Sequence, residues 1–177
     1  YGVARRGGFA NQGVAFAVDP IGNLDHLFSF TGGSGSNLGS GPMPPLLSRP
    51  DGTLYGLTRN TASADDDGGT LFKIDTNGVR ATVVDFSNTE VSNPSSGLVA
   101  GTNGLWYATT GAGGATGDGA IISFNSSTES WELAASFDSP ITGSRPGGPI
   151  LIGPDGNLYG YTTEGGSAGL GSIYQFN

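Results

Sequence analysis

The sequence predicts an all-β fold of tandem repeats, because glycine-rich turns separate short apolar runs that recur with a fixed period. Glycine accounts for 33 of the 177 residues, with 10 prolines, a composition too rich in turn formers for a helical protein. Aromatic residues make up 10% of the chain, which is too many for a disordered one. No stretch keeps an apolar period of 3.6 residues, so we expect essentially no helix.

The repeat is visible in three segments that align without gaps, at 42–55 (PMPPLLSRPDGTLY), 94–107 (PSSGLVAGTNGLWY) and 146–159 (PGGPILIGPDGNLY). Successive copies are 52 residues apart, and Tyr1-Gly2 matches the end of a fourth. A search for internal periods decides the fold of repeat proteins. We therefore predict one repeat domain over 1–177, with a partial blade at 1–30, blades at 42–86 and 94–137, and a partial blade at 146–177.

Each repeat contains four apolar runs with the β-branched and aromatic residues typical of strands. A proline-containing turn is expected before the first run, and a phenylalanine (Phe30, Phe86 or Phe137) closes the fourth. Two-residue hairpin turns are expected where Gly or Asn can take positive φ. Their candidates are Asp51-Gly52, Asn103-Gly104, Asp155-Gly156 and Asn77-Gly78.

Four antiparallel strands per unit and a period near 50 indicate a β-propeller with about 3.5 blades in this chain. A β-solenoid is the alternative, although its coils are usually shorter. The copies contain three, four, four and three runs, so the chain opens and closes within a blade. It begins with Tyr1 and no initiator Met, as expected of a mature, processed or partly observed chain. Unpaired sheet edges invite association, so we expect a longer propeller, a ring of two chains or a filament, joined through the terminal strands at Tyr1, Phe16, Tyr174 and Phe176.

Composition excludes several classes of partner and site. Only 12% of residues are charged, the net charge is −8, and Lys73 is the single lysine, so nucleic acid is not expected as a partner. With no cysteine, disulfides and thiolate zinc sites are excluded. No apolar run reaches the ~18 residues of a membrane-spanning helix. A polar, lysine-poor and cysteine-free acidic chain is typical of bacterial extracellular proteins.

Candidate chemistry is sparse. Asp65, Asp66 and Asp67 form the densest charged cluster and could supply some oxygen ligands to calcium, but they lack the spacing of an EF-hand loop, and a solvated loop is the favoured interpretation. His26 is the only histidine, which excludes any site that needs a pair of them. The glutamates show no sign of convergence, so we expect no enzyme activity and no cofactor.

The remaining candidates are aromatic residues in phase with the repeat, which are Trp106, Tyr107, Trp131 and Tyr159. Aromatic faces on a propeller rim can stack on sugar rings while nearby Asn and Asp bind hydroxyl groups. Side chains in phase with a repeat more often form the core between blades, and that interpretation is favoured.

Several stretches resemble the repeat of bacterial choice-of-anchor GloVer-type tandem repeat proteins. They are 69–75 (GTLFKID), 154–160 (PDGNLYG) and 158–166 (LYGYTTEGG). The third copy departs most, since residues 105–108 (LWYA) replace LYG. In another copy, an Asp-rich loop at 61–69 replaces the usual Gly-Gly turn. The resemblance implies a secreted or surface-attached propeller-like array with no assigned catalytic residues. We therefore expect a non-catalytic, self-associating structural module, or alternatively a lectin-like module that binds glycans.

Overall fold

The computed structural model describes residues 1–33, 35, 37–62 and 68–177, and all of its sheets are antiparallel. The chain divides into two compact units, Tyr1–Asn88 and Thr89–Asn177. The 3-10 turn η1 (Phe86–Asn88) is the one helical element in the described ranges. None of the described residues forms a helix with the length and apolar character needed to cross a membrane. The all-β prediction is confirmed.

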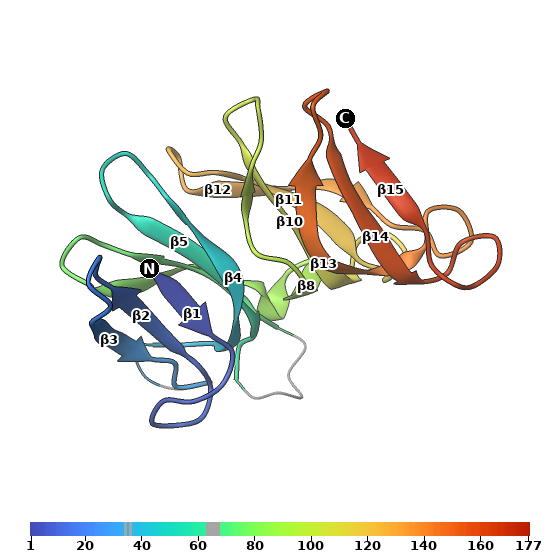
Figure 1. Ribbon diagram of the computed structural model, residues 1–177. Helices are drawn as coiled ribbons and strands as arrows, with labels where there is room; N and C mark the ends of the chain where they lie inside the picture. The colour runs from blue at the N-terminus through green and yellow to red at the C-terminus, as the bar shows by residue number, and fades with distance from the viewer. Residues whose placement is uncertain (34, 36, 63–67) are drawn as a thin grey trace. The chain divides into compact units, whose positions relative to one another are not determined.

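The first unit contains two sheets whose strands pair with their sequence neighbours (Figure 1). The first sheet consists of β1 (Gly2–Ala4), β2 (Val14–Val18) and β3 (Leu24–Ser29). The second sheet consists of β4 (Ser40–Ser48), β5 (Leu54–Asn60), β6 (Thr70–Ile74) and β7 (Arg80–Asp85).

The second unit repeats this plan. The third sheet consists of β8 (Val91–Pro94), β9 (Val99–Ala100), β10 (Trp106–Gly113), β11 (Ala120–Asn125) and β12 (Ser130–Ser136). The fourth consists of β13 (Ser144–Ile152), β14 (Leu158–Glu164) and β15 (Ile173–Phe176). Both β8 and β9 pair with β10, so together they take the place of one first strand. None of these sheets closes on itself, and the propeller and the single repeat domain remain predictions.

The first strands of the second and fourth sheets correct one expectation. The prolines precede no strand; they lie within it, at Pro42 in β4 and Pro146 in β13. Pairing with the second strand is interrupted at the same place in each copy, between Met43 and Leu47 and between Gly147 and Leu151. Proline lacks an N–H to donate and is therefore confined to edge strands and irregular pairing.

The hairpin turns are one residue longer than predicted. In the first turn of the second sheet, Arg49 donates its N–H to the Thr53 carbonyl at 2.8 Å, and Gly52 donates to the Arg49 carbonyl at 3.0 Å. Three residues therefore span the turn, and only the glycine has positive φ, at 87°. This is the pattern of a type I turn closed by a glycine in a left-handed conformation. Asp75–Val79 and Gly153–Asn157 are bonded in the same way.

The phenylalanine that closes each fourth run continues the ladder one residue past the strand. The N–H groups of Phe30, Phe86 and Phe137 donate to the carbonyls of Gly13, Gly69 and Gly119, each at 2.9 Å. All three side chains are buried. The repeated bond places the three phenylalanines at the same position of the ladder in their sheets.

In three of the four sheets, a glycine in the second strand of the repeat makes room for a ring on the third strand. The directly opposed pairs are Gly2–Phe16, Gly56–Phe72 and Gly160–Tyr174. A Cβ at Gly56 would lie 2.6 Å from Cζ of Phe72. In the third sheet the same opposed pair is Ala108–Ile122. The departure from LYG in the third copy is therefore matched by a smaller partner across the strand.

Candidate functional site

The third and fourth sheets pack face to face within the second unit. The third sheet contributes Tyr107, Ile121 and Phe137 to this core, and the fourth contributes Ile150, Leu158, Tyr174 and Phe176. Two aromatic contacts cross the interface: Phe137 meets Tyr174 with ring centroids 4.8 Å apart, and Tyr107 meets Phe176 at 6.0 Å. Burial raises the pKa of Tyr174 to about 12, since the phenolate would have to form away from water.

The first and second sheets pack in the same way within the first unit. Ala15, Phe28 and Phe30 of the first sheet meet Leu54, Phe72 and Ile74 of the second. Phe30 lies edge-on to Phe72 at 5.2 Å. The guanidinium of Arg80 lies 5.7 Å from the Phe30 ring and 5.3 Å from the Phe72 ring, within the range of a cation–π contact.

A backbone contact accompanies each interface. Gly41 donates its N–H to the Gln12 carbonyl at 2.9 Å, and Arg145 donates to the Asp118 carbonyl at 2.9 Å. The next residue is a proline in both cases. Its ring lies against a glycine, so that a Cβ on Gly13 or Gly119 would approach Cδ of Pro42 or Pro146 to 2.4 or 2.7 Å. Within each unit, the same kind of contact therefore joins its two sheets.

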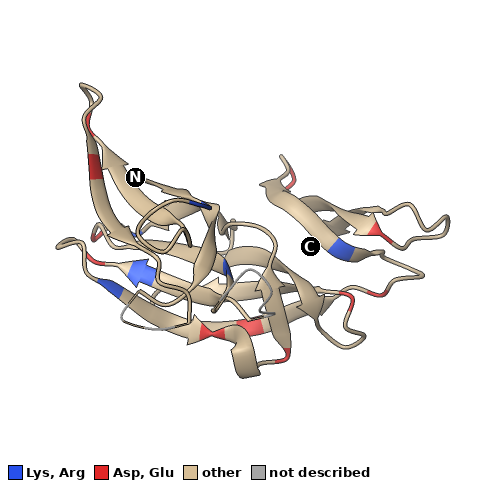
Figure 2. Ribbon diagram, turned by 90° about the horizontal axis from the view of Figure 1, so that it is seen from below, with Lys and Arg blue, Asp and Glu red and all other residues tan. Residues whose placement is uncertain are grey.

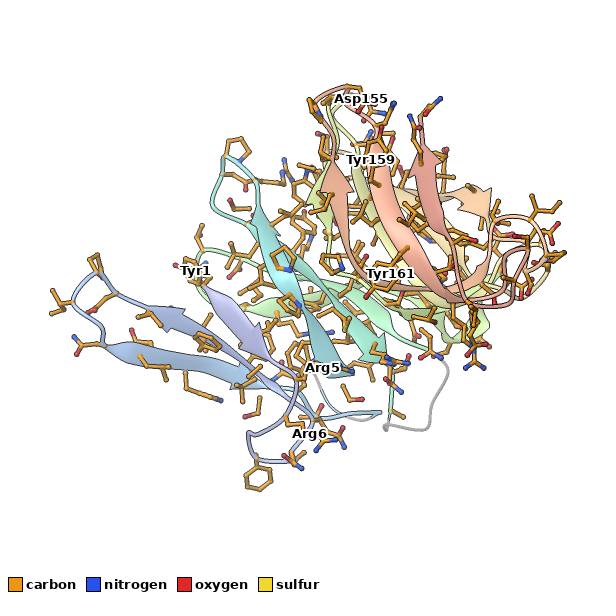
Figure 3. The ribbon with its side chains drawn as sticks, turned by 45° about the vertical axis from the view of Figure 1, so that its right-hand side comes forward. Tyr1, Arg5, Arg6, Asp155, Tyr159 and Tyr161 are labelled. Carbon is orange, nitrogen blue, oxygen red and sulfur yellow. The ribbon has the colours of Figure 1, made fainter. Side chains whose placement is uncertain are left out.

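The outer face of the fourth sheet is equivalent, by its place in the repeat, to the face through which the third sheet packs against the fourth. Successive residues of a strand point to opposite faces, so Leu151, Tyr159, Tyr161 and Ile173 lie opposite the packed side. We call these four residues the fourth-sheet face; Figure 3 marks Tyr159 and Tyr161 on β14. Tyr161 is directly opposite Ile173, as Thr109 is opposite Ile121 in the third sheet. Thr109 and Ile121 are buried, whereas Tyr161 is 47% and Ile173 86% exposed.

Three equivalent tyrosines line three hollows. Tyr1 lines a cavity of about 530 Å³ with Leu54 and Ile74 of the second sheet. Tyr107 lines one of about 220 Å³ with Leu158 and Phe176 of the fourth. The two hollows lie between successive sheets, because each contains side chains from both.

The third hollow lies on the fourth-sheet face. It has a volume of about 580 Å³ and is lined by Tyr159 together with Leu151, Pro154 and neighbouring turn residues, all from the fourth sheet. In the hollows at Tyr1 and Tyr107, the next sheet along the chain supplies the other wall. At Tyr159 only the wall from the fourth sheet is present.

The outer face of the first sheet is equivalent, by its place in the repeat, to the face through which the second sheet packs against the first. Phe16, Val18 and Leu24, which we call the first-sheet face, match Phe72, Ile74 and Arg80 of the second sheet by their place in the repeat. In the second sheet these positions pack against the first sheet. In the first sheet Val18 is 50% and Leu24 65% exposed, and Phe16 is partly buried over Gly2.

The structure separates the four aromatic residues predicted for glycan binding. Tyr107 points into the interface with the fourth sheet, and Tyr159 lies on the fourth-sheet face. Trp106 and Trp131 are each opposite Phe124 in neighbouring strands, so they share the other face of the third sheet. The four side chains form no common site, and a role in glycan binding remains a prediction.

The residues predicted for assembly are also divided. Phe16 belongs to the first-sheet face and Tyr1 is exposed at the start of the same sheet (Figure 3). Tyr174 and Phe176 instead pack against the third sheet. Sequence reasoning missed Tyr161 and Ile173, although their place beside Tyr159 in the alternation of β14 and β15 was available as a signal.

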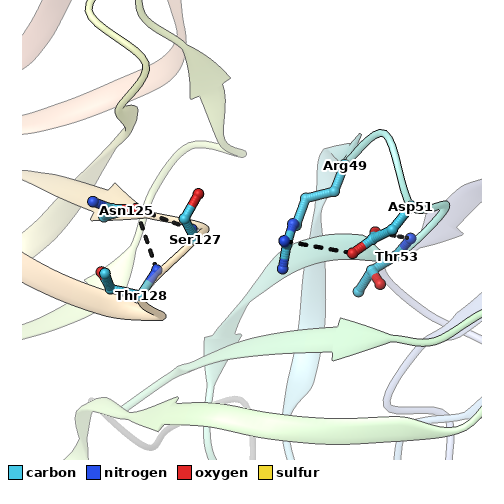
Figure 4. A network of polar contacts seen from close by, with 6 residues as sticks. All are labelled: Arg49, Asp51, Thr53, Asn125, Ser127 and Thr128. Atoms are coloured by element: carbon cyan, nitrogen blue, oxygen red, sulfur yellow. Dashed lines mark hydrogen bonds and ion pairs between the residues drawn. The ribbon is translucent and has the colours of Figure 1, made fainter.

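The aspartates of the turns serve as acceptors for backbone N–H groups. Oδ1 of Asp51 accepts from Thr53 at 2.9 Å, and its Oδ2 lies 3.5 Å from Nη2 of Arg49 (Figure 4). The bond from the Thr53 N–H lowers the pKa of Asp51. In the third sheet, Asn125 does the same with the N–H groups of Ser127 and Thr128 (Figure 4).

Two further aspartates have lowered pKa values for the same kind of reason. The pKa of Asp19 is lowered chiefly by the N–H of Asn23, at 2.8 Å from Oδ1. The pKa of Asp155 is lowered chiefly by the hydroxyl of Tyr159, which donates to Oδ2 at 2.6 Å and whose own pKa is raised by that bond. These carboxylates stabilise turns, and their bonds account for their positions without a ligand.

Other candidate chemistry is limited to one exposed pair. Nε2 of His26 lies 3.0 Å from Oγ of Ser29, and both residues belong to the exposed edge strand β3. Within the described ranges no three His, Asp or Glu residues gather in a way that could hold a metal ion. Asp65, Asp66 and Asp67 lie outside the described residues, so the calcium hypothesis remains a prediction.

Charged side chains are few and spread over strands and turns (Figure 2). The ion pair between Arg145 and Glu164, at 3.1 Å, is exposed, and screening by water keeps such pairs weak. The four residues of the fourth-sheet face are aliphatic or aromatic and carry no charge.

Comparison with known proteins places the chain in a repeat family. No curated protein matches it. Residues 45–177, three quarters of the chain, match the family described as the Gloeobacter/Verrucomicrobia repeat, which confirms the resemblance seen in the sequence. The chain belongs to the Gloeobacter/Verrucomicrobia repeat family.

Proposed function

We propose that the chain is a non-catalytic assembly module of an extracellular bacterial protein, in which β-sheets of one repeat stack face to face. The observation that carries this proposal is the fourth-sheet face. It repeats the positions that the third sheet buries against its neighbour, yet Tyr161 and Ile173 are exposed. Contiguous apolar surface of this kind marks sites of protein association.

The turn aspartates and the family match support a non-catalytic role. The turn aspartates accept backbone N–H groups and the Tyr159 hydroxyl, which gives them a structural role in the turns. The matched family is described as a repeat, which agrees with a structural module. The secreted or surface-attached location is proposed from the cysteine-free, lysine-poor composition, and fractionation of the native cells into medium, surface and interior would test it.

Association is tested by the dependence of molar mass on concentration. Light scattering coupled to size exclusion should show a mass above that of one chain, rising with concentration. Tyr161→Arg together with Ile173→Arg should abolish the rise, because two charges would be buried without partners. Ile141→Arg is the matched control, since Ile141 is exposed in a loop of the same unit and should leave association unchanged.

A wild-type chain that stays at the mass of one chain at every concentration would contradict the proposal, as would equal association of the doubly substituted variant. Electron microscopy of the associated material distinguishes its forms. Closed multimers indicate a ring completed by more than one chain, and fibres indicate an open array.

Carbohydrate binding is the second candidate, favoured by one observation. The cavity at Tyr107 combines an aromatic ring with Asn103 and Asp155, a combination suited to a sugar. Against it, Nδ2 of Asn103 already donates to the Tyr107 hydroxyl at 2.7 Å, and Asp155 is bonded to Tyr159. A glycan array tests this candidate: binding that Tyr107→Phe weakens would support it, and an array without hits would exclude it.

A further inference from the structure

We propose that association is head to tail: the fourth-sheet face of one chain binds the first-sheet face of a second copy. This inference rests on the proposed assembly function and adds the partner surface and its direction. Its starting point is that both internal interfaces have the same polarity. In each interface, one sheet contributes the face that carries Tyr107 and Ile121 or their equivalents, which we call the first type. The next sheet contributes the face that carries Leu158 and Phe176 or their equivalents, which we call the second type.

The two outer faces are the two halves of this contact. The fourth-sheet face repeats the first type, because Tyr159, Tyr161 and Ile173 take the places of Tyr107, Thr109 and Ile121. The first-sheet face repeats the second type, because Phe16 and Val18 take the places of Tyr174 and Phe176. Two fourth-sheet faces would bring together two surfaces of the same type, an arrangement that neither unit shows.

The repeat also predicts which side chains meet. Inside the second unit, Phe176 lies edge-on to Tyr107, and both line the same hollow. By equivalence, Val18 of the second copy enters the hollow lined by Tyr159 and Leu151. Leu24 lies directly opposite Val18 in β3 and reaches the same surface. A contact between unlike faces can add copies without limit, or close when the rotation allows it.

The test uses two variants that each lose one face. The first carries Tyr161→Arg and Ile173→Arg, and the second carries Val18→Arg and Leu24→Arg. All four side chains are about half exposed or more, so both variants should fold; circular dichroism and thermal melting verify this. Phe9→Arg and Ile141→Arg are controls for the first and fourth sheets, because both residues are exposed in loops away from the two faces.

The expected result is that each variant alone has the mass of one chain, whereas an equimolar mixture has twice that mass and goes no further. The mixture retains one intact fourth-sheet face and one intact first-sheet face, so a single contact forms. Control variants should associate as the wild type does.

Two results would overturn the head-to-tail proposal while leaving the assembly function intact. If the variant without its first-sheet face still self-associates, the contact joins two fourth-sheet faces. If the wild type associates but the mixture stays at the mass of one chain, the contact uses other surfaces. A wild-type chain that never associates would instead contradict the proposed function itself.

Discussion

At the scale of single residues, the absence of a side chain at Gly56 in β5 leaves the space that the Phe72 ring of β6 occupies. A Cβ at Gly56 would lie 2.5 Å from Cδ2 of Leu46 and 2.6 Å from Cζ of Phe72. Phe72 is fully buried against Phe30 and Arg80, so its ring has little room to move. Gly56→Ala should therefore lower the free energy of unfolding by ~1–3 kcal/mol, measured by urea denaturation.

The third sheet supplies the matched rescue, because it carries Ala108 opposite Ile122 at these positions. The double variant Gly56→Ala/Phe72→Ile should lose less stability than the two single variants lose together, with a coupling energy of ~0.5–3 kcal/mol. Additive losses in the double variant would show that the glycine and the ring are independent, contrary to the steric explanation.

The turn aspartates should make stability depend on acid. Asp19, Asp51 and Asp155 have pKa values below the ordinary 3.8 in the folded chain. Their contribution is therefore fully present above pH ~4 and is lost as the pH falls through the folded-state values. Melting temperature measured between pH 6 and pH 2.5 should fall, and less so in the triple variant with Asn at these positions.

Asparagine is the suitable replacement because Asn125 and Asn103 already serve in the equivalent turns, accepting backbone N–H groups through Oδ1. The substitution keeps the acceptor and removes the titration. An equal acid-induced loss in both proteins would assign the effect to other carboxylates.

At the scale of elements, the loops that end in Gly13 and Gly119 hold successive sheets together. Gly119 has a φ of 102°, and a Cβ there would lie 2.5 Å from the Thr110 carbonyl and 2.7 Å from Cδ of Pro146. Gly117, in the same loop, has a φ of 85° and open space around it. Gly117→Ala should cost ~1 kcal/mol of strain, and Gly119→Ala a further ~1–3 kcal/mol from crowding.

The pair of variants separates backbone strain from crowding, because both glycines need positive φ but only at Gly119 would a Cβ meet the Thr110 carbonyl and the Pro146 ring. Urea denaturation monitored by tryptophan fluorescence measures the difference. Equal losses in the two variants would mean that the proline contact contributes nothing to the interface.

The strands and turns were predictable because their signals are local. Asp51-Gly52 and Asn77-Gly78 mark turns through the backbone freedom of glycine, and those turns exist. The third residue of each turn was missed because the dipeptide alone does not show that its Asp or Asn keeps negative φ. The prolines of β4 and β13 were misassigned to turns, since an edge strand with interrupted pairing tolerates them.

The candidate site was only half predictable for a different reason. Alternation along β14 and β15 shows that Tyr161 and Ile173 share one face, but not whether another sheet covers it. The equivalent residues Thr109 and Ile121 are buried, and Ile121 lies in the core that the fourth sheet completes. Exposure depends on which neighbour is present, and that information lies outside any single repeat. Tyr174 and Phe176 were misjudged in the same way, because they lie on the covered face.

At the scale of the whole molecule, each unit has its own core, centred on equivalent phenylalanines. Phe30 is buried among the residues of the first unit and Phe137 among those of the second. In repeat proteins stability is approximately a sum over repeats and their nearest interfaces. Loss of one core should therefore open its own unit first, and the other unit should keep most of its protection.

Hydrogen exchange measured by mass spectrometry tests this independence. Phe30→Ala, which removes ~3–5 kcal/mol of packing, should accelerate exchange within residues 1–88, and Phe137→Ala within residues 89–177. Phe30→Leu and Phe137→Leu are milder versions for use if the alanine variants do not fold. If either substitution accelerated exchange equally in both halves, the chain would unfold as one cooperative body, and the division into two cores would have no energetic meaning.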